Sequence, residues 1–133
     1  MSQENVEVVR RAWQAFARGG VEATLEGWTE DCVFEEFPEM PESAVYVGRD
    51  RLSEAVEHFT EMWSDLVWEP LEFIDAGENL VIAVVRYRGR GRASGAPLDA
   101  LATWLYEMRD GRVSRARAFT TKQQALEAAG LRE

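Results

Sequence analysis

Residues 28–50, WTEDCVFEEFPEMPESAVYVGRD, carry the clearest structural signals in the chain. They read as a short strand over residues 32–37, a loop broken by two prolines, an extended segment over residues 45–47 and a turn into a helix. Because side chains alternate between the two faces of a strand, Phe34 and Glu36 are expected on the same face. Phe34 would belong to the core, and Glu36 would place a carboxyl group at the edge of that core.

Helices are predicted on both sides of this stretch. Residues 5–18 carry apolar side chains three and four positions apart, which is typical of one face of a helix. A shorter helix is expected over residues 21–28. A third is expected over residues 51–63, with Asp50 as its N-cap. Because Pro38 and Pro41 lack the N–H group that a strand ladder needs, residues 39–43 are expected to form a surface loop.

The second half of the chain changes to a period of two, which is typical of strands. The expected strands cover residues 66–74, 80–92, 98–108 and 112–120, with turn sequences between them. A closing helix is expected over residues 121–129, where Thr121 and Gln124 have the spacing of a capping box. Helices separated from antiparallel strands indicate a single α+β domain over residues 1–133, with the helices packed across one face of a curved antiparallel sheet.

Composition excludes several classes of function. The formal charge of −9 argues against nucleic-acid and anionic-membrane partners, which need a basic surface. The longest aliphatic run, residues 80–85, is too short to cross a bilayer. A single cysteine, Cys32, forms no intrachain disulfide, which is typical of a cytoplasmic protein. Because His58 and Cys32 are the only soft ligands, neither a zinc or iron site nor another cofactor is expected.

Three segments resemble the nuclear-transport-factor-2-like superfamily, in particular its SnoaL-like (polyketide-cyclase-like) branch. They are VRRAWQAFARGGVEATLEGWTEDCVFEE at residues 9–36, YVGRD at 46–50 and YEMRDGRVSRARAF at 106–119. The resemblance implies a cone-shaped α+β fold with a deep hydrophobic cavity and a homodimer formed through the outer face of the sheet. Members include ketosteroid isomerases, dehydratases, epoxide hydrolases and polyketide cyclases, so the fold alone does not set the chemistry.

Only some of the catalytic residues known from the family have a counterpart in this chain. Ketosteroid isomerases have a carboxylate base at the end of the first strand, and Glu36 matches that place. Their oxyanion hole uses a tyrosine of the first helix and an acid of the penultimate strand, which match Ala12 and Trp104 here. No histidine matches those of the dehydratases. Neither the Asp-Arg-Asp set of the epoxide hydrolases nor the aspartate of SnoaL is found.

Three residues are candidates for acid–base chemistry. Glu36 would act as a general base, its pKa raised by burial among Phe34, Trp63 and Trp104, and Tyr106 or Arg86 would polarise the substrate. The alternative is a solvated Glu36 at the rim, paired with an arginine. Seven aromatic residues are candidates for ligand contact, with plain core packing as the alternative: Trp13, Phe16, Trp28, Phe34, Phe59, Trp63 and Trp104.

Two further groups of side chains have plainer interpretations. Four alternating arginines at positions 86, 88, 90 and 92 share one face of their strand, and the first of them could pair with Glu36. His58 is expected at the boundary of the third helix, and Cys32 is expected as a small buried side chain.

The leading hypothesis is a small-molecule pocket protein that binds an apolar or aromatic ligand. It would be a cofactor-free isomerase, cyclase or dehydratase in which Glu36 transfers protons. One alternative is a carrier or sensor with the same cavity and no catalysis. Another is a dimeric association module whose exposed sheet face forms the functional surface.

Overall fold

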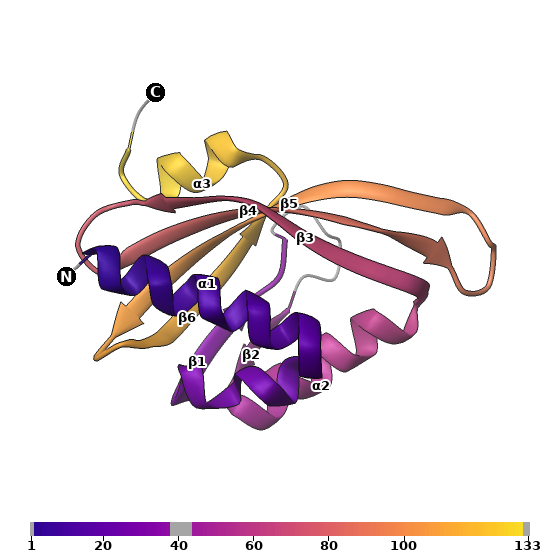
Figure 1. Cartoon of the computed structure of the whole chain (residues 1–133), viewed down its shortest axis with the longest axis horizontal. Coiled ribbons are helices and arrows are strands. Elements are labelled where there is room, and N and C mark those ends of the chain that lie inside the picture. Colours follow the sequence, from indigo (N-terminus) through magenta and orange to yellow (C-terminus); the bar gives the residue numbers. More distant parts are fainter. Residues whose placement is uncertain (1, 38–43, 132–133) are drawn as a thin grey trace.

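The computed structural model describes residues 2–37 and 44–131 (Figure 1). The loop expected over residues 39–43 lies outside this part of the chain. The helices are α1 (Ser2–Gly19), the 3-10 helix η1 (Val21–Gly27), α2 (Arg49–Glu61) and α3 (Lys122–Ala128). The strands are β1 (Trp28–Glu35), β2 (Val45–Val47), β3 (Trp63–Asp75), β4 (Leu80–Gly91), β5 (Pro97–Arg109) and β6 (Arg112–Phe119).

The six strands form one curved sheet in the order β2-β1-β6-β5-β4-β3. This α+β architecture confirms the predicted fold class. The sheet is antiparallel with one exception, because β1 and β6 run parallel. Between them the chain forms β2, α2 and three long strands, and it then returns beside β1 in the same direction. This pairing joins residues about 80 positions apart, for example Phe34 with Ala116, and completes the wall of the cone.

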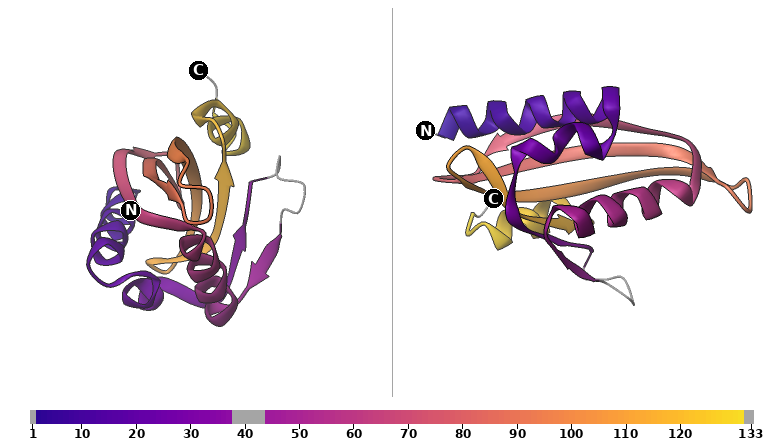
Figure 2. Two further views of the ribbon diagram at one scale, coloured as in Figure 1. Left: turned by 90° about the vertical axis from the view of Figure 1, so that its right-hand side faces the viewer. Right: turned by 90° about the horizontal axis from the view of Figure 1, so that it is seen from below.

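The helices divide between the two faces of the sheet. α1, η1 and α2 cover the concave face, and α3 packs on the outer face against β4, β5 and β6 (Figure 2). Side chains alternate between these faces along β4. Val81, Ala83 and Val85 lie in the core under α1, whereas Ile82 lies in a smaller cluster with α3. The two faces of β4 therefore pack against different helices.

Two boundaries near α2 differ from the prediction. The helix begins at Arg49 with Gly48 as its N-cap, not at Asp50, and the φ of 95° at Gly48 is a backbone conformation that glycine adopts at little cost. It ends at Glu61, so that Trp63 opens β3 instead of closing the helix. β1 likewise begins at Trp28, where it pairs with Val113 of β6, four residues before the predicted start.

The C-terminal helix confirms a local prediction. The Thr121 side chain accepts a hydrogen bond from the backbone N–H of Gln124, and the Gln124 side chain accepts from the backbone N–H of Thr121, which completes the capping box. Among the described residues, no helix is long and apolar enough to cross a membrane.

Candidate functional site

A cavity of about 160 Å³ lies between the helices and the concave face of the sheet. The side chains that line it come from α1, η1, α2 and the sheet, and half of them are aromatic. Six of the seven aromatic residues predicted to contact a ligand are in this lining: Trp13, Phe16, Trp28, Phe34, Phe59 and Trp104. The sequence therefore brings distant aromatic residues to one place.

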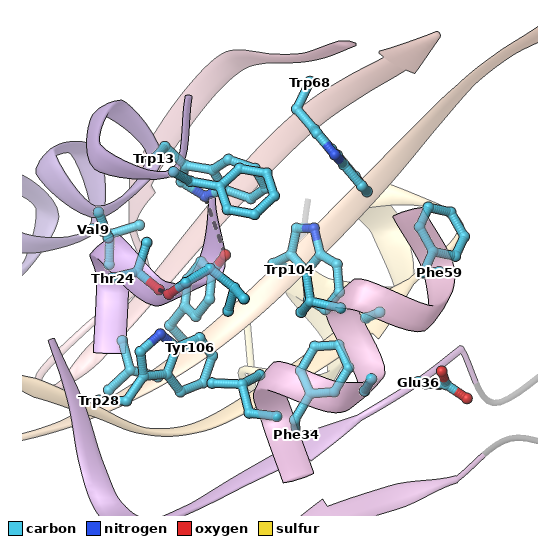
Figure 3. Close-up of a pocket in the computed structure, with 18 of the residues that line it drawn as sticks. Val9, Trp13, Thr24, Trp28, Phe34, Glu36, Phe59, Trp68, Trp104 and Tyr106 are labelled. Carbon is cyan, nitrogen blue, oxygen red and sulfur yellow. Dashed lines mark hydrogen bonds between the residues drawn. The ribbon is translucent and has the colours of Figure 1, made fainter. Parts of the chain in front are cut away.

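One end of the cavity holds a partly buried hydrogen bond between α1 and β5. The indole N–H of Trp13 donates to the Tyr106 hydroxyl over 3.1 Å (Figure 3). The ring of Trp28 packs edge-on against Tyr106, which is only 6% exposed. Burial raises the pKa of Tyr106 far above its ordinary value. The hydroxyl therefore keeps its proton and remains a hydrogen-bond donor.

The middle of the cavity wall is formed by Trp104, two residues before Tyr106 on the same face of β5. Its ring stacks on Phe34, with ring centres 5.3 Å apart and planes 24° apart, and it also packs against Phe37. Its indole nitrogen is buried and has no hydrogen-bond partner among the described residues. In Figure 3 this nitrogen lies on the side of the ring that faces Trp68. An unpaired donor thus borders the cavity.

Glu36 lies at the other end of the cavity, away from Trp28 and Tyr106 (Figure 3). It follows directly after β1, half-buried, and is the one carboxylate among the described lining residues. The Tyr46 hydroxyl lies near it, and burial together with the neighbouring Glu36 charge raises the pKa of Tyr46. The preceding residue, Glu35, points to the outer face and binds the Arg115 guanidinium over 2.7 Å. The expected alternation of β1 therefore continues through Glu36.

A group of aromatic rings from α2, β3 and β4 also lines the cavity. Trp68 of β3 stacks on Tyr87 of β4 with ring centres 5.0 Å apart, and Phe59 of α2 lies 5.8 Å from Trp68. Trp68 also reaches Trp13, 5.8 Å away. Aromatic contact therefore continues from α1 through β3 to α2 and β4.

The structure places two predicted site residues elsewhere. Arg86 binds Asp99 through two hydrogen bonds of 2.6 and 2.8 Å, so the predicted pairing with Glu36 is wrong. The reason is strand alternation, because Tyr87 faces the cavity and its neighbour must face outward. Trp63 packs against Phe59 but is not among the residues that line the cavity, and it opens β3 instead of closing α2.

Sequence reasoning missed four aromatic residues of this site: Phe37, Tyr46, Trp68 and Tyr87. Tyr87 could have been found, since it continues the Val81, Ala83 and Val85 series on β4. Trp68 lies before an irregularity in the pairing of β3 with β4, which hides the alternation of that strand. Tyr46 comes close to Glu36 because β2 pairs with β1, and no local sequence pattern indicates this pairing.

The remaining soft ligands lie apart from one another. His58 is exposed on α2, and Cys32 is fully buried in β1, where burial raises the pKa of its thiol. Within residues 2–37 and 44–131, no three His, Cys, Asp or Glu side chains come together as possible metal ligands.

Comparison with known proteins bears on this geometry. An NTF2-like protein from Burkholderia thailandensis is 20% identical, with a TM-score of 0.79 over 96% of this chain and 98% of that one. Bal32a, from a soil-derived mobile gene cassette, is 20% identical, with a TM-score of 0.78 over 88% of both chains. TerC, co-crystallised with polyporic acid, is 18% identical, with a TM-score of 0.75 over 96% of this chain and 98% of that one.

A search of the curated proteins found no match. The sequence profile of the SnoaL-like domain matches residues 9–116, which include most of the cavity lining. The chain therefore belongs to the SnoaL-like domain family.

Proposed function

We propose that this protein binds a flat, mostly apolar small molecule in the cavity between the helices and the sheet. The observation that carries the proposal is a hollow of about 160 Å³ with a half-aromatic lining. An apolar cavity of about 150 Å³ in another protein accommodates benzene. Ligand sites are typically apolar cavities with a few convergent polar groups, and Glu36, Trp104 and Tyr106 supply such groups here.

The TerC structure supports the choice of a ring-shaped ligand. That protein was crystallised with polyporic acid, and it shares the fold of this chain at 18% identity. The identity supports a common architecture only, so the ligand class for this chain depends on its own aromatic lining.

A second candidate function is proton transfer by Glu36. The described lining contains this single carboxylate and no lysine, arginine or histidine. Its carboxylate would accept a proton from an acidic C–H bond of the bound ligand and return that proton at another position. The ligand would hold the electron pair of the broken C–H bond meanwhile, so the step needs no cofactor. The nearby Tyr46 hydroxyl would donate a hydrogen bond to the carboxylate and fix its position.

Deuterium exchange tests this chemistry without knowledge of the natural substrate. The probe is 1-indanone in D₂O, a two-ring ketone whose C–H bonds beside the carbonyl exchange slowly in buffer. We expect the protein to accelerate this exchange, measured by proton NMR. Glu36→Gln should return the rate to the buffer value while the affinity for the probe changes less than about threefold.

Glu35→Gln is the matched control, because Glu35 faces the other side of the sheet and binds Arg115. That variant should keep the wild-type exchange rate. Equal rates in wild type and Glu36→Gln would remove Glu36 from the chemistry. Probe binding without any exchange would favour the carrier or sensor alternative.

A second copy of the chain is the proposed protein partner, bound at the outer face of the sheet. On that face β5 presents Leu101, which pairs across from Arg86 and is 51% exposed. Light scattering during size-exclusion chromatography should give twice the chain mass of 15.1 kDa. Leu101→Glu should reduce it to the monomer mass. A wild-type monomer at high concentration would contradict the proposal.

A further inference from the structure

The cavity wall contains a donor without an acceptor. The indole nitrogen of Trp104 is buried and lacks a hydrogen-bond partner among the described residues. A buried polar group without a partner costs about 1–3 kcal/mol, so such groups are uncommon in folded proteins. Its position on the cavity side of β5 means that a molecule in the cavity could satisfy it (Figure 3).

The Tyr106 hydroxyl supplies a second donor beside it. Within the described part of the chain, its one hydrogen bond is the one it accepts from Trp13. A hydroxyl that accepts through a lone pair still has its hydrogen to donate. Burial keeps this hydroxyl protonated, because it raises the pKa of Tyr106. The hydrogen is therefore left for a molecule in the cavity.

The two donor side chains lie on the same face of β5, beside the cavity. Trp104 and Tyr106 are two positions apart on β5, so their side chains leave the same face of the strand about 7 Å apart. In Figure 3 the Tyr106 hydroxyl lies toward Trp13 and the Trp104 nitrogen toward Trp68, both on the inner side of the wall. An sp² oxygen has two lone pairs and can accept from both donors.

The charge of the cavity selects an uncharged acceptor. The described lining holds no cationic side chain to balance a carboxylate or phenolate, and Glu36 adds a negative charge at the far end. An anion placed there would lose its hydration without an opposite charge to compensate. A ketone or quinone oxygen accepts the same hydrogen bonds without that cost.

We infer that Trp104 and Tyr106 form a subsite for one uncharged acceptor oxygen, and that the ligand is a flat, apolar carbonyl compound. The inference rests on the proposed function, because it specifies the ligand class of the same cavity. It also assigns a role to Trp104, whose indole N–H is a donor at the position where ketosteroid isomerases have an acid.

Two probes of nearly equal shape test the subsite: indane and 1-indanone, which differ by the carbonyl group. A carbonyl buried without partners loses its hydrogen bonds to water, so 1-indanone would bind more weakly than indane to a plain apolar cavity. We expect the wild type to bind 1-indanone at least as tightly as indane, measured by calorimetry. Binding of 1-indanone tenfold weaker than that of indane would overturn the inference.

Variants then assign the effect to the two donors. Tyr106→Phe should weaken 1-indanone binding about fivefold or more, the value of one neutral hydrogen bond, and leave indane within twofold. Replacement of Trp104 by 3-benzothienylalanine, in which sulfur takes the place of the N–H group, should do the same. The same replacement at Trp63, whose buried indole nitrogen also lacks a partner among the described residues but which does not line the cavity, should leave both affinities unchanged.

Indane is the internal reference for each variant, because a loss of packing weakens both probes alike. Equal weakening of both probes by Tyr106→Phe and by the Trp104 replacement would overturn the subsite. Binding of indane together with tenfold weaker binding of 1-indanone would overturn the subsite and leave the proposed function in place. Failure of both probes to bind would overturn the proposed function and the subsite together.

Infrared spectroscopy gives a readout that does not depend on affinity. The carbonyl stretch of ¹³C-labelled 1-indanone should lie at lower frequency in the wild-type complex than in the Tyr106→Phe complex, because hydrogen bonds weaken the C=O bond. Equal frequencies would contradict the subsite. Indane-1-carboxylate should bind at least tenfold more weakly than 1-indanone, and equal affinity would contradict the selection for an uncharged oxygen.

Discussion

The two faces of the sheet differ in whether their polar side chains have partners. On the outer face, charged side chains of neighbouring strands pair with one another, as Arg86 does with Asp99 and Arg115 with Glu35. On the concave face, the same strands border a hollow where the Trp104 indole N–H has no partner. These outer charges are thus already paired, whereas the Trp104 N–H on the cavity side has no partner within the described residues. This contrast locates function on the concave face.

The largest expected effect on stability comes from placing an arginine on the concave face of β4, compared with removing the arginine next to it on the outer face. Val85 is fully buried on the concave face, and Arg86 is on the outer face. Val85→Arg would bury an unpaired charge and should cost about 4 kcal/mol or more, enough to unfold many small domains. Arg86→Val should barely move the midpoint of urea denaturation. Similar midpoints for the two variants would show that the faces do not differ as described.

Loss of the hydrogen bond between Trp13 and Tyr106 should have the next largest effect on stability. Tyr106→Phe leaves the Trp13 N–H without its acceptor, so the free energy of unfolding should fall by about 1–3 kcal/mol. Urea denaturation measures this change. Tyr87→Phe is the matched control, since no hydrogen bond of the Tyr87 side chain is seen among the described residues. An equal loss in both variants would remove the special role of the Trp13–Tyr106 pair.

The raised pKa of Tyr106 should also make the stability of the fold depend on pH. The folded chain raises the pKa of Tyr106, whereas the unfolded chain has the ordinary value near 10. Above pH 10 the unfolded chain therefore releases this proton and the folded chain keeps it, so stability present below pH 10 is lost as the pH rises. Between pH 10 and 11 the wild type should lose up to about 1.4 kcal/mol more than Tyr106→Phe.

Urea denaturation at pH 9, 10 and 11 checks this difference. Burial also raises the pKa of Tyr46 and Tyr87, so both proteins should show a remaining slope. Parallel slopes in wild type and Tyr106→Phe would contradict the buried position of Tyr106.

The smallest expected change in stability accompanies a large change in binding. Ala118 lines the cavity from β6 and is almost fully buried. Ala118→Leu would place extra methyl groups in existing space, so the free energy of unfolding should change by about 1 kcal/mol or less. Indane binding should weaken more than tenfold. Ala128→Leu on the exposed side of α3 is the control, and it should leave binding unchanged. Unaltered binding in Ala118→Leu would place the ligand elsewhere.

Local sequence patterns predicted what depends on neighbours in the chain. Alternation along β1 placed Phe34 and Glu36 on the cavity side, and capping chemistry placed the start of α3 at Thr121. The face of Arg86 could not be predicted in this way. β4 is covered on both sides where it precedes this residue, so residues 81–85 are all buried and show no alternation.

Other features depended on contacts between distant segments. Phe59 and Trp63 are four residues apart, which fits a continuing helix as well as the start of β3. The parallel pairing of β1 with β6 and the contact of Tyr46 with Glu36 join strands that no local pattern connects. The sequence could thus indicate an aromatic cavity with a carboxylate, but not the residues that complete it.

Methyl NMR during a titration with indane tests the central claim most directly. Ala55, Val113 and Ala118 line the cavity, whereas Val67 and Leu101 are exposed. We predict saturable shifts of the three cavity methyl signals, with the exposed methyl signals unchanged. Absence of shifts at the cavity methyl groups, or shifts confined to Val67 and Leu101, would contradict a ligand site on the concave face.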